Sequence, residues 1–156
     1  EYKNGSQKIE SGSFADFLYI EKSNFKKHIY SKMITGMEMN SPCRTLYKTE
    51  LIQNVRFRED MITGEDLVFN INIFSVAKNF LFLPFAYYYY YQSNSGLTGK
   101  GLNVIKKYKC NIKISAILLK HLKKWDMFNF INITKTVLRL FFITLSKLKR
   151  RYLKSV

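Results

Sequence analysis

The chain has 156 residues, 47% of them apolar and 16% aromatic, which is enough for one domain with a hydrophobic core and excludes a disordered composition. Residues 101–156 hold 14 Lys and Arg and one acidic residue, so they carry +13 of the total net charge of +15. This basic half predicts contact with a membrane surface, nucleic acid or a phosphorylated ligand, unless its lysines only solvate helices. Cys43 and Cys110 lack zinc or disulfide spacing and indicate reduced thiols in a cytosolic setting.

The first third of the chain predicts short helices joined by loops. Apolar residues spaced three and four apart predict helices over residues 14–22 and 24–34. Residues 43–55 are expected to begin extended and to become a short helix. Residues 56–64 are polar and predict a loop that Phe57 anchors.

A longer helix is predicted over residues 65–78, with Glu65 and Asp66 in its first turn. Its apolar stripe is expected at Leu67, Ile71, Phe74 and Ala77. A strand is the alternative, because Ile and Val are frequent and apolar and polar residues partly alternate there. The aromatic run over residues 79–92 predicts a strand.

The basic tail predicts two amphipathic helices. The apolar stripe of the first is expected at Ile105, Tyr108, Ile112, Ala116, Leu119 and Leu122. The stripe of the second is expected at Val137, Leu140, Phe141, Thr144, Leu145 and Leu148. Arg139 interrupts the apolar run, so a membrane span of about 20 apolar residues is not predicted. A basic helix lying on an anionic membrane is favoured instead.

One part of the chain resembles a known enzyme family. Residues 41–70 read SPCRTLYKTELIQNVRFREDMITGEDLVFN, and YYYYYQ and SNSGLT follow at residues 87–98. In order and spacing these segments resemble the C-terminal half of family 2 glycosyltransferases, which are inverting, nucleotide-sugar-dependent enzymes of the GT-A fold. The resemblance covers residues 41–98. It implies an α/β fold, of which this chain would form a helix-rich α+β part. Residues 1–99 would belong to the GT-A domain, and residues 100–156 would form a basic helical extension.

The resemblance implies a catalytic role for the pair of acids. Asp66 would be the general base that takes the proton from an acceptor hydroxyl, and Glu65 would bind the acceptor or orient the base. A carboxylate is suited to this work, and the first turn of a helix stabilises its charge. The alternative is that both acids only stabilise the start of the helix.

The resemblance also implies substrate contacts. Tyr47 and Lys48 match the family's LYK element, either as substrate-binding residues or as a structural support beside the active site. Gln92, Ser93 and Ser95 would lie near the donor diphosphate, or form an ordinary polar loop. Relatives often carry an arginine where Gln92 stands, and glutamine supplies no positive charge.

The sequence contains no D-x-D motif, with which these enzymes usually hold a divalent metal. We therefore expect no cofactor in this chain, and Mn²⁺ or Mg²⁺ in the intact enzyme, where a nucleotide sugar and a glycan acceptor would be the substrates. The chain is expected to be a C-terminal fragment that is inactive alone, and whose apolar surface is covered by its C-terminal helices or by formation of a homo-oligomer. The expected location is the cytoplasm, peripherally on the inner face of the cell membrane.

The expected activity is a step in building a bacterial surface polysaccharide. The alternatives are a basic nucleic-acid-binding module and an interaction domain without chemistry. Nucleic-acid binding is disfavoured because the sequence shows no aromatic RNA-binding motif, no zinc spacing and no clear recognition helix.

Overall fold

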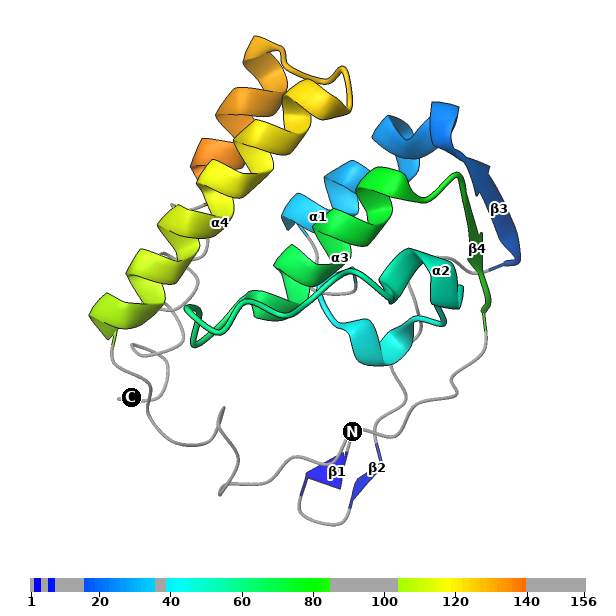
Figure 1. Cartoon of the computed structure of the whole chain (residues 1–156), viewed down its shortest axis with the longest axis horizontal. Helices are drawn as coiled ribbons and strands as arrows, with labels where there is room; N and C mark the ends of the chain where they lie inside the picture. Colours follow the sequence, from blue (N-terminus) through cyan, green and yellow to red (C-terminus); the bar gives the residue numbers. More distant parts are fainter. Residues whose placement is uncertain (1, 4–5, 8–15, 36–38, 85–103, 140–156) are drawn as a thin grey trace.

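The computed structural model describes residues 2–3, 6–7, 16–35, 39–84 and 104–139. These residues form a mixture of helices and strands, which confirms the predicted fold class at this level (Figure 1). The strands are β1 (Tyr2–Lys3), β2 (Ser6–Gln7), β3 (Leu18–Glu21) and β4 (Asn79–Phe82). They pair as two antiparallel two-stranded sheets, β1 with β2 and β3 with β4.

Helices make up most of the described chain. The short ones are η1 (Lys22–Asn24), η2 (Lys26–Tyr30, a π-helix), α1 (Ser31–Thr35), η3 (Pro42–Arg44) and α2 (Thr49–Ile52). The long ones are α3 (Glu65–Val76) and α4 (Val104–Lys124), and a further helical segment covers residues 130–139. The predicted helix over residues 24–34, the short helix within residues 43–55 and the loop over residues 56–64 are therefore confirmed. The extended start expected for residues 43–55 is wrong at residues 43–44, which belong to η3.

Helix α3 forms the centre of the core. Figure 1 shows it in the middle of the molecule, with α4 alongside. Its buried residues are Leu67, Val68, Phe69, Asn70, Ile71, Ile73 and Phe74. The helix is buried on nearly all sides, and a helix enclosed by protein needs no polar face. This explains why the sequence pattern of residues 65–78 did not exclude a strand. The predicted helix and its buried stripe are confirmed.

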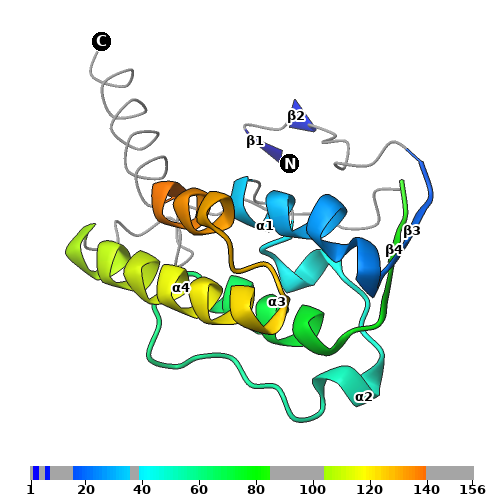
Figure 2. The ribbon, with the colours of Figure 1, turned by 90° about the horizontal axis from the view of Figure 1, so that it is seen from above.

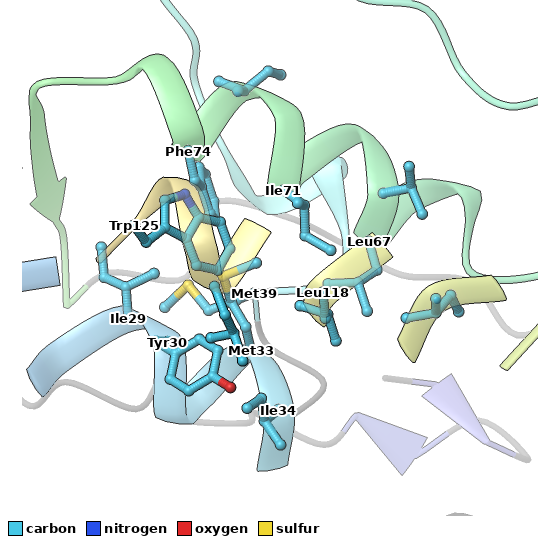
Figure 3. Close-up of a cluster of buried hydrophobic side chains, with 14 of the residues drawn as sticks. Ile29, Tyr30, Met33, Ile34, Met39, Leu67, Ile71, Phe74, Leu118 and Trp125 are labelled. Atoms are coloured by element: carbon cyan, nitrogen blue, oxygen red, sulfur yellow. The ribbon is translucent and has the colours of Figure 1, made fainter. Parts of the chain in front are cut away.

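The core continues from α3 onto the helices around it. Figure 3 shows Leu118 of α4 beside Leu67 of α3, and Trp125 close to Phe74. The ring of Trp125 packs on Phe25 with 4.9 Å between centroids, and its indole N–H donates to the hydroxyl of Ser75 at 3.0 Å. Residues from both ends of the described chain thus share one buried cluster.

The predicted helix over residues 14–22 is wrong where the structure describes it, because residues 18–21 form strand β3. In the β3–β4 register Leu18 lies opposite Phe82 and Ile20 lies opposite Phe80. Ile20 is buried while its neighbours along the strand are more exposed, as strand alternation requires. The pairing with β4, which is about 60 residues away, decided the conformation, and local spacing could not indicate it.

Helix α4 is present as predicted, but its predicted apolar stripe is wrong over its first four residues and right at Leu122, which is buried. Three of the exposed residues, Ile105, Tyr108 and Ile112, are 66%, 51% and 45% exposed. Besides Leu122, the packed face carries Cys110, Ile114 and Leu118. The sequence of α4 offers two apolar faces, and packing on α3 uses one of them.

The helical segment over residues 130–139 lies next to α4 and is connected to η2 by a hydrogen bond. The Tyr30 hydroxyl and the Thr136 hydroxyl are 2.8 Å apart, and Thr136 donates to the carbonyl of Asn132. Of the second predicted stripe only Val137 falls within the described residues, and it is half-exposed. None of the helices in the described ranges is both long enough and apolar enough to cross a membrane.

Candidate functional site

The candidate site lies where the loop over residues 56–64 enters α3. Gly64 is the N-cap and has a φ of +82°, a left-handed conformation that favours glycine. A Cβ added at Gly64 would overlap the Cδ1 atom of Ile114 in α4. The glycine therefore allows both the sharp entry into the helix and the close contact with α4. It fixes where the two acids that follow it are placed.

Asp66 is partly buried in the first turn of α3. Its pKa is raised, mainly because burial penalises the charged carboxylate and secondly because Glu65 adds a like charge. The positive end of the helix dipole favours the charged form, but these two effects outweigh it. A carboxyl with a raised pKa is a stronger base than an ordinary aspartate once it is ionised.

Glu65 is also only partly accessible. One of its carboxylate oxygens, Oε2, is buried and accepts no hydrogen bond from the described residues. The same is true of the side-chain oxygen of Asn40, two residues before the short helix η3. A buried acceptor without a partner is costly, and such groups are frequent where a ligand supplies the missing donor.

Tyr47 reaches the same end of α3 from a segment 19 positions earlier in the sequence. Its hydroxyl donates to Oδ1 of Asn70 at 2.5 Å, and Asn70 lies one turn after Asp66. The pKa of Tyr47 is raised, chiefly by burial and in smaller part by the negative charge of Asp66, while a hydrogen bond with Thr45 opposes the shift. The structure thus brings Tyr47 and Asp66, both predicted site residues, into one neighbourhood.

Asn70 is a residue of this site that the sequence analysis did not identify. It is fully buried, and its side-chain amide donates to the backbone carbonyl of Met39 at 2.7 Å. Asn70 therefore joins Tyr47, the segment before η3 and α3 through a satisfied polar contact. The signal was present in the sequence, because an asparagine inside the apolar run LVFNINIF needs a buried partner.

The loop before α3 is held at both of its sides. Phe57 stacks on Phe69 with ring centroids 4.2 Å apart and an interplanar angle of 5°, which confirms the predicted anchor. Asp60 accepts hydrogen bonds from Arg58 at 2.6 Å and from Lys113 of α4 at 2.8 Å. These two cations hold the pKa of Asp60 well below its usual range. The loop that leads to the acids is thus attached to α3 and to α4.

Among the other predicted site residues, Lys48 alone lies within the described ranges. Lys48 is exposed and immediately precedes α2. Gln92, Ser93 and Ser95 lie outside the described residues, as does the boundary expected near residue 99.

The described residues do not fit a divalent metal. Within them, no three His, Cys, Asp or Glu side chains lie close enough together to hold a metal ion. Cys43 and Cys110 are free thiols. His121 is buried and its Nδ1 lies 2.9 Å from the carbonyl of Ile117, a contact within its own helix. No chemical step at this site is therefore assigned to a metal.

Comparison with protein-family models, with curated proteins and with solved structures found no match for this chain.

Proposed function

We propose that this chain is the acceptor-side part of an inverting, nucleotide-sugar-dependent glycosyltransferase that acts in the synthesis of a bacterial surface polysaccharide. The acceptor would bind at the N-terminal end of α3, and Asp66 would be the general base. The donor nucleotide sugar and its metal would be held by a D-x-D part of the enzyme, which this sequence does not contain.

The observation that carries the proposal is the meeting of Tyr47 and Asp66. The part of the family resemblance that lies in residues 41–70 includes the LYK element, Leu46–Lys48, and the acids Glu65 and Asp66, which are 19 positions apart when counted from Tyr47 to Asp66. In the structure the hydroxyl of Tyr47 bonds to Asn70, one helical turn from Asp66, and the charge of Asp66 acts on that hydroxyl. Two segments that matter for the resemblance thus contribute to one site.

The chemistry of the site fits acceptor activation. Asp66 would accept the proton of an acceptor hydroxyl as that oxygen forms a bond to the anomeric carbon of the donor sugar. The bond between this carbon and the nucleoside diphosphate breaks in the same step, and the diphosphate leaves with the bonding electrons. Attack from the opposite side inverts the configuration. Glu65 has a buried oxygen without a hydrogen-bond donor, which would accept a second sugar hydroxyl.

An alternative role for the acids is stabilisation of the helix alone. That role favours exposed carboxylates with ordinary or lowered pKa values, because the helix dipole stabilises the anion. Partial burial and a raised pKa for Asp66 favour a functional site over that alternative.

The test is sugar binding by the chain and by matched variants. The chain would be applied to a panel of immobilised oligosaccharides, together with the variants Asp66→Asn and Tyr47→Phe and the control variant Lys78→Gln. Lys78 is an exposed residue immediately before β4. We expect binding to a subset of glycans, weakened in the first two variants and retained in the control. Absence of binding to every glycan, or equal binding by all four proteins, would overturn the proposal.

A second measurement addresses the donor side. Nucleotide sugars, and UDP with Mn²⁺, would be titrated into the chain by calorimetry. We expect no binding, because the D-x-D motif is lacking. Tight, metal-dependent binding would contradict the assignment of this chain to the acceptor side.

A further inference from the structure

The helical segment over residues 130–139 has an inverted polarity. Its buried positions include Thr136 and Arg139, and one guanidinium nitrogen of Arg139 is buried and makes no hydrogen bond within the described part of the chain. Apart from Lys135, its exposed positions are apolar: Phe130 and Ile131 are 82% and 63% exposed, and Val137 and Leu138 are 47% and 42% exposed. Helices at the surface of a protein in water normally show the opposite arrangement, with apolar side chains turned inward. The outer side of this segment is therefore suited to an apolar environment.

Helix α4 shows a related arrangement on its outer side. Tyr108 and Ile112 are exposed and lie one turn apart, on the face that does not pack on α3. Lys109, which follows Tyr108 in the sequence, is exposed as well, and so is Lys120, two turns beyond Ile112. A helix with an apolar ridge bordered by lysines is typical of binding at a membrane surface.

A groove connects the two helices near the turn between them. It has a volume of about 380 Å³ and is lined by Leu119, Lys120, Lys123, Phe128 and Ile133. The Nζ atom of Lys123 lies 5.0 Å from the centroid of the Phe128 ring. Figure 2 shows α4 and the following helical segment side by side at one edge of the molecule. The apolar floor and the two lysines together suit an amphiphile with an anionic head group.

We propose that the outer side of the helical hairpin, formed by α4 and the helical segment over residues 130–139, docks on an anionic lipid bilayer. The docking face is defined by Lys120, Lys123, Phe128, Phe130 and Ile131. Phe128, Phe130 and Ile131 would enter the boundary between head groups and acyl chains, and the two lysines would contact lipid phosphates. The proposal does not depend on the glycosyltransferase assignment, since it rests on a surface away from the N-terminal end of α3.

Charge and apolar character together select lipid over other partners. Asp126 is the only acidic residue between residues 101 and 156, so the partner is expected to be anionic. Nucleic acid is anionic, but its phosphate backbone would leave Phe130 and Ile131 in water. A bilayer with anionic lipid supplies both the negative surface and the apolar layer below it.

The test is flotation of the full chain with vesicles. Vesicles of phosphatidylcholine alone would be compared with vesicles that also contain phosphatidylglycerol. Two paired variants would be measured, Phe130→Ser with Ile131→Ser, and Lys120→Gln with Lys123→Gln. Their controls are Leu46→Ser, at a residue that is 96% exposed between η3 and α2, and Lys78→Gln. Circular dichroism would show that each variant retains its helices.

We expect binding to the anionic vesicles and weak binding to the neutral ones. Loss of the two lysines should weaken binding by about 10- to 30-fold, as removal of two interfacial charges predicts. Loss of the two apolar side chains should weaken it by about tenfold or more, and the two control variants should bind like the unchanged chain.

Several results would overturn the proposal. One is equal binding to neutral and anionic vesicles. Another is binding that is lost on removal of the charges in residues 147–154 and is unchanged in the docking-face variants. A third is self-association of the chain in solution that Phe130→Ser with Ile131→Ser abolishes. Binding to DNA or RNA that requires the lysines but not the apolar side chains would also contradict it.

Discussion

Replacement of Gly64 by alanine tests the placement of the candidate site most directly. The residue has a φ of +82°, and a Cβ there would overlap Cδ1 of Ile114. A left-handed conformation costs a residue with a Cβ about 1–2 kcal/mol. An added methyl group in a packed place costs about 1–3 kcal/mol more, because Ile114 or the helices must shift. Gly64→Ala should therefore lower the free energy of unfolding by about 2–5 kcal/mol, a large part of the usual total of about 5–15 kcal/mol.

The two contributions can be separated by a second substitution. Ile114→Val removes Cδ1, the atom nearest to the added methyl group. Because Ile114 is buried, this change alone should cost about 0.5–1.5 kcal/mol. In the double variant the overlap is relieved, so its cost should be smaller than the sum of the two single costs by about 1–2 kcal/mol. The conformational cost at residue 64 should remain.

The assay is urea denaturation of the four proteins, followed by circular dichroism. Gly64→Ala with an unchanged midpoint would show that residue 64 does not adopt the left-handed conformation in solution. Costs that add within about 0.5 kcal/mol would show that Gly64 and Ile114 are not in contact. Either result would refute the account of how α3 and its acids are fixed against α4.

Three further changes probe the contacts around the core. Because folding raises the pKa of Asp66, its contribution to stability is present below the unfolded pKa of about 3.9 and is lost as pH rises through the folded pKa. At pH 7 the variant Asp66→Asn should therefore have a higher melting temperature than the unchanged chain, and below about pH 3.9 this difference should disappear. If Asp66 only stabilised the helix, the variant would have a lower melting temperature than the unchanged chain at pH 7. Lys22→Met removes the ammonium group that donates hydrogen bonds to the carbonyls of Phe74 and Ser75 in the last turn of α3. It should lower the free energy of unfolding, measured by urea denaturation, by about 1–2 kcal/mol. An unchanged midpoint would contradict a stabilising role of these two hydrogen bonds. Tyr30→Phe should lower the free energy of unfolding by about 1 kcal/mol. In the double variant with Thr136→Val, the loss should be smaller than the sum of the losses in the two single variants. Losses that add in full would contradict the hydrogen bond between the two hydroxyls.

The candidate site could be predicted from the sequence in part. The first turn of α3 and the two acids in it follow from local spacing and from a glycine before two carboxylates. The meeting with Tyr47 could only be inferred from the family resemblance, because 19 positions separate it from Asp66. Asn70 was missed although an asparagine inside an apolar run was a signal, and its partner, the carbonyl of Met39, is not indicated by any local pattern.

Residues whose conformation depends on near neighbours were predicted well. The helices α3 and α4 and the loop over residues 56–64 have local signals: spacing of three and four, acids in a first turn, and a polar run with one aromatic anchor. The mixture of helices and strands was implied by the family resemblance, and strand β3 was not among the predicted elements. The sequence by itself therefore determined which long segments are helical.

Only the tertiary structure decided which side of each segment is buried. Residues 18–21 became a strand because β4 pairs with them, although their spacing also suits a helix. Helix α4 has two apolar faces, and α3 packs on the face with Ile114 and Leu118 and leaves the face with Tyr108 and Ile112 exposed. Which side is buried depends on the volume and shape of elements that are distant in the sequence, and the local sequence pattern does not indicate them.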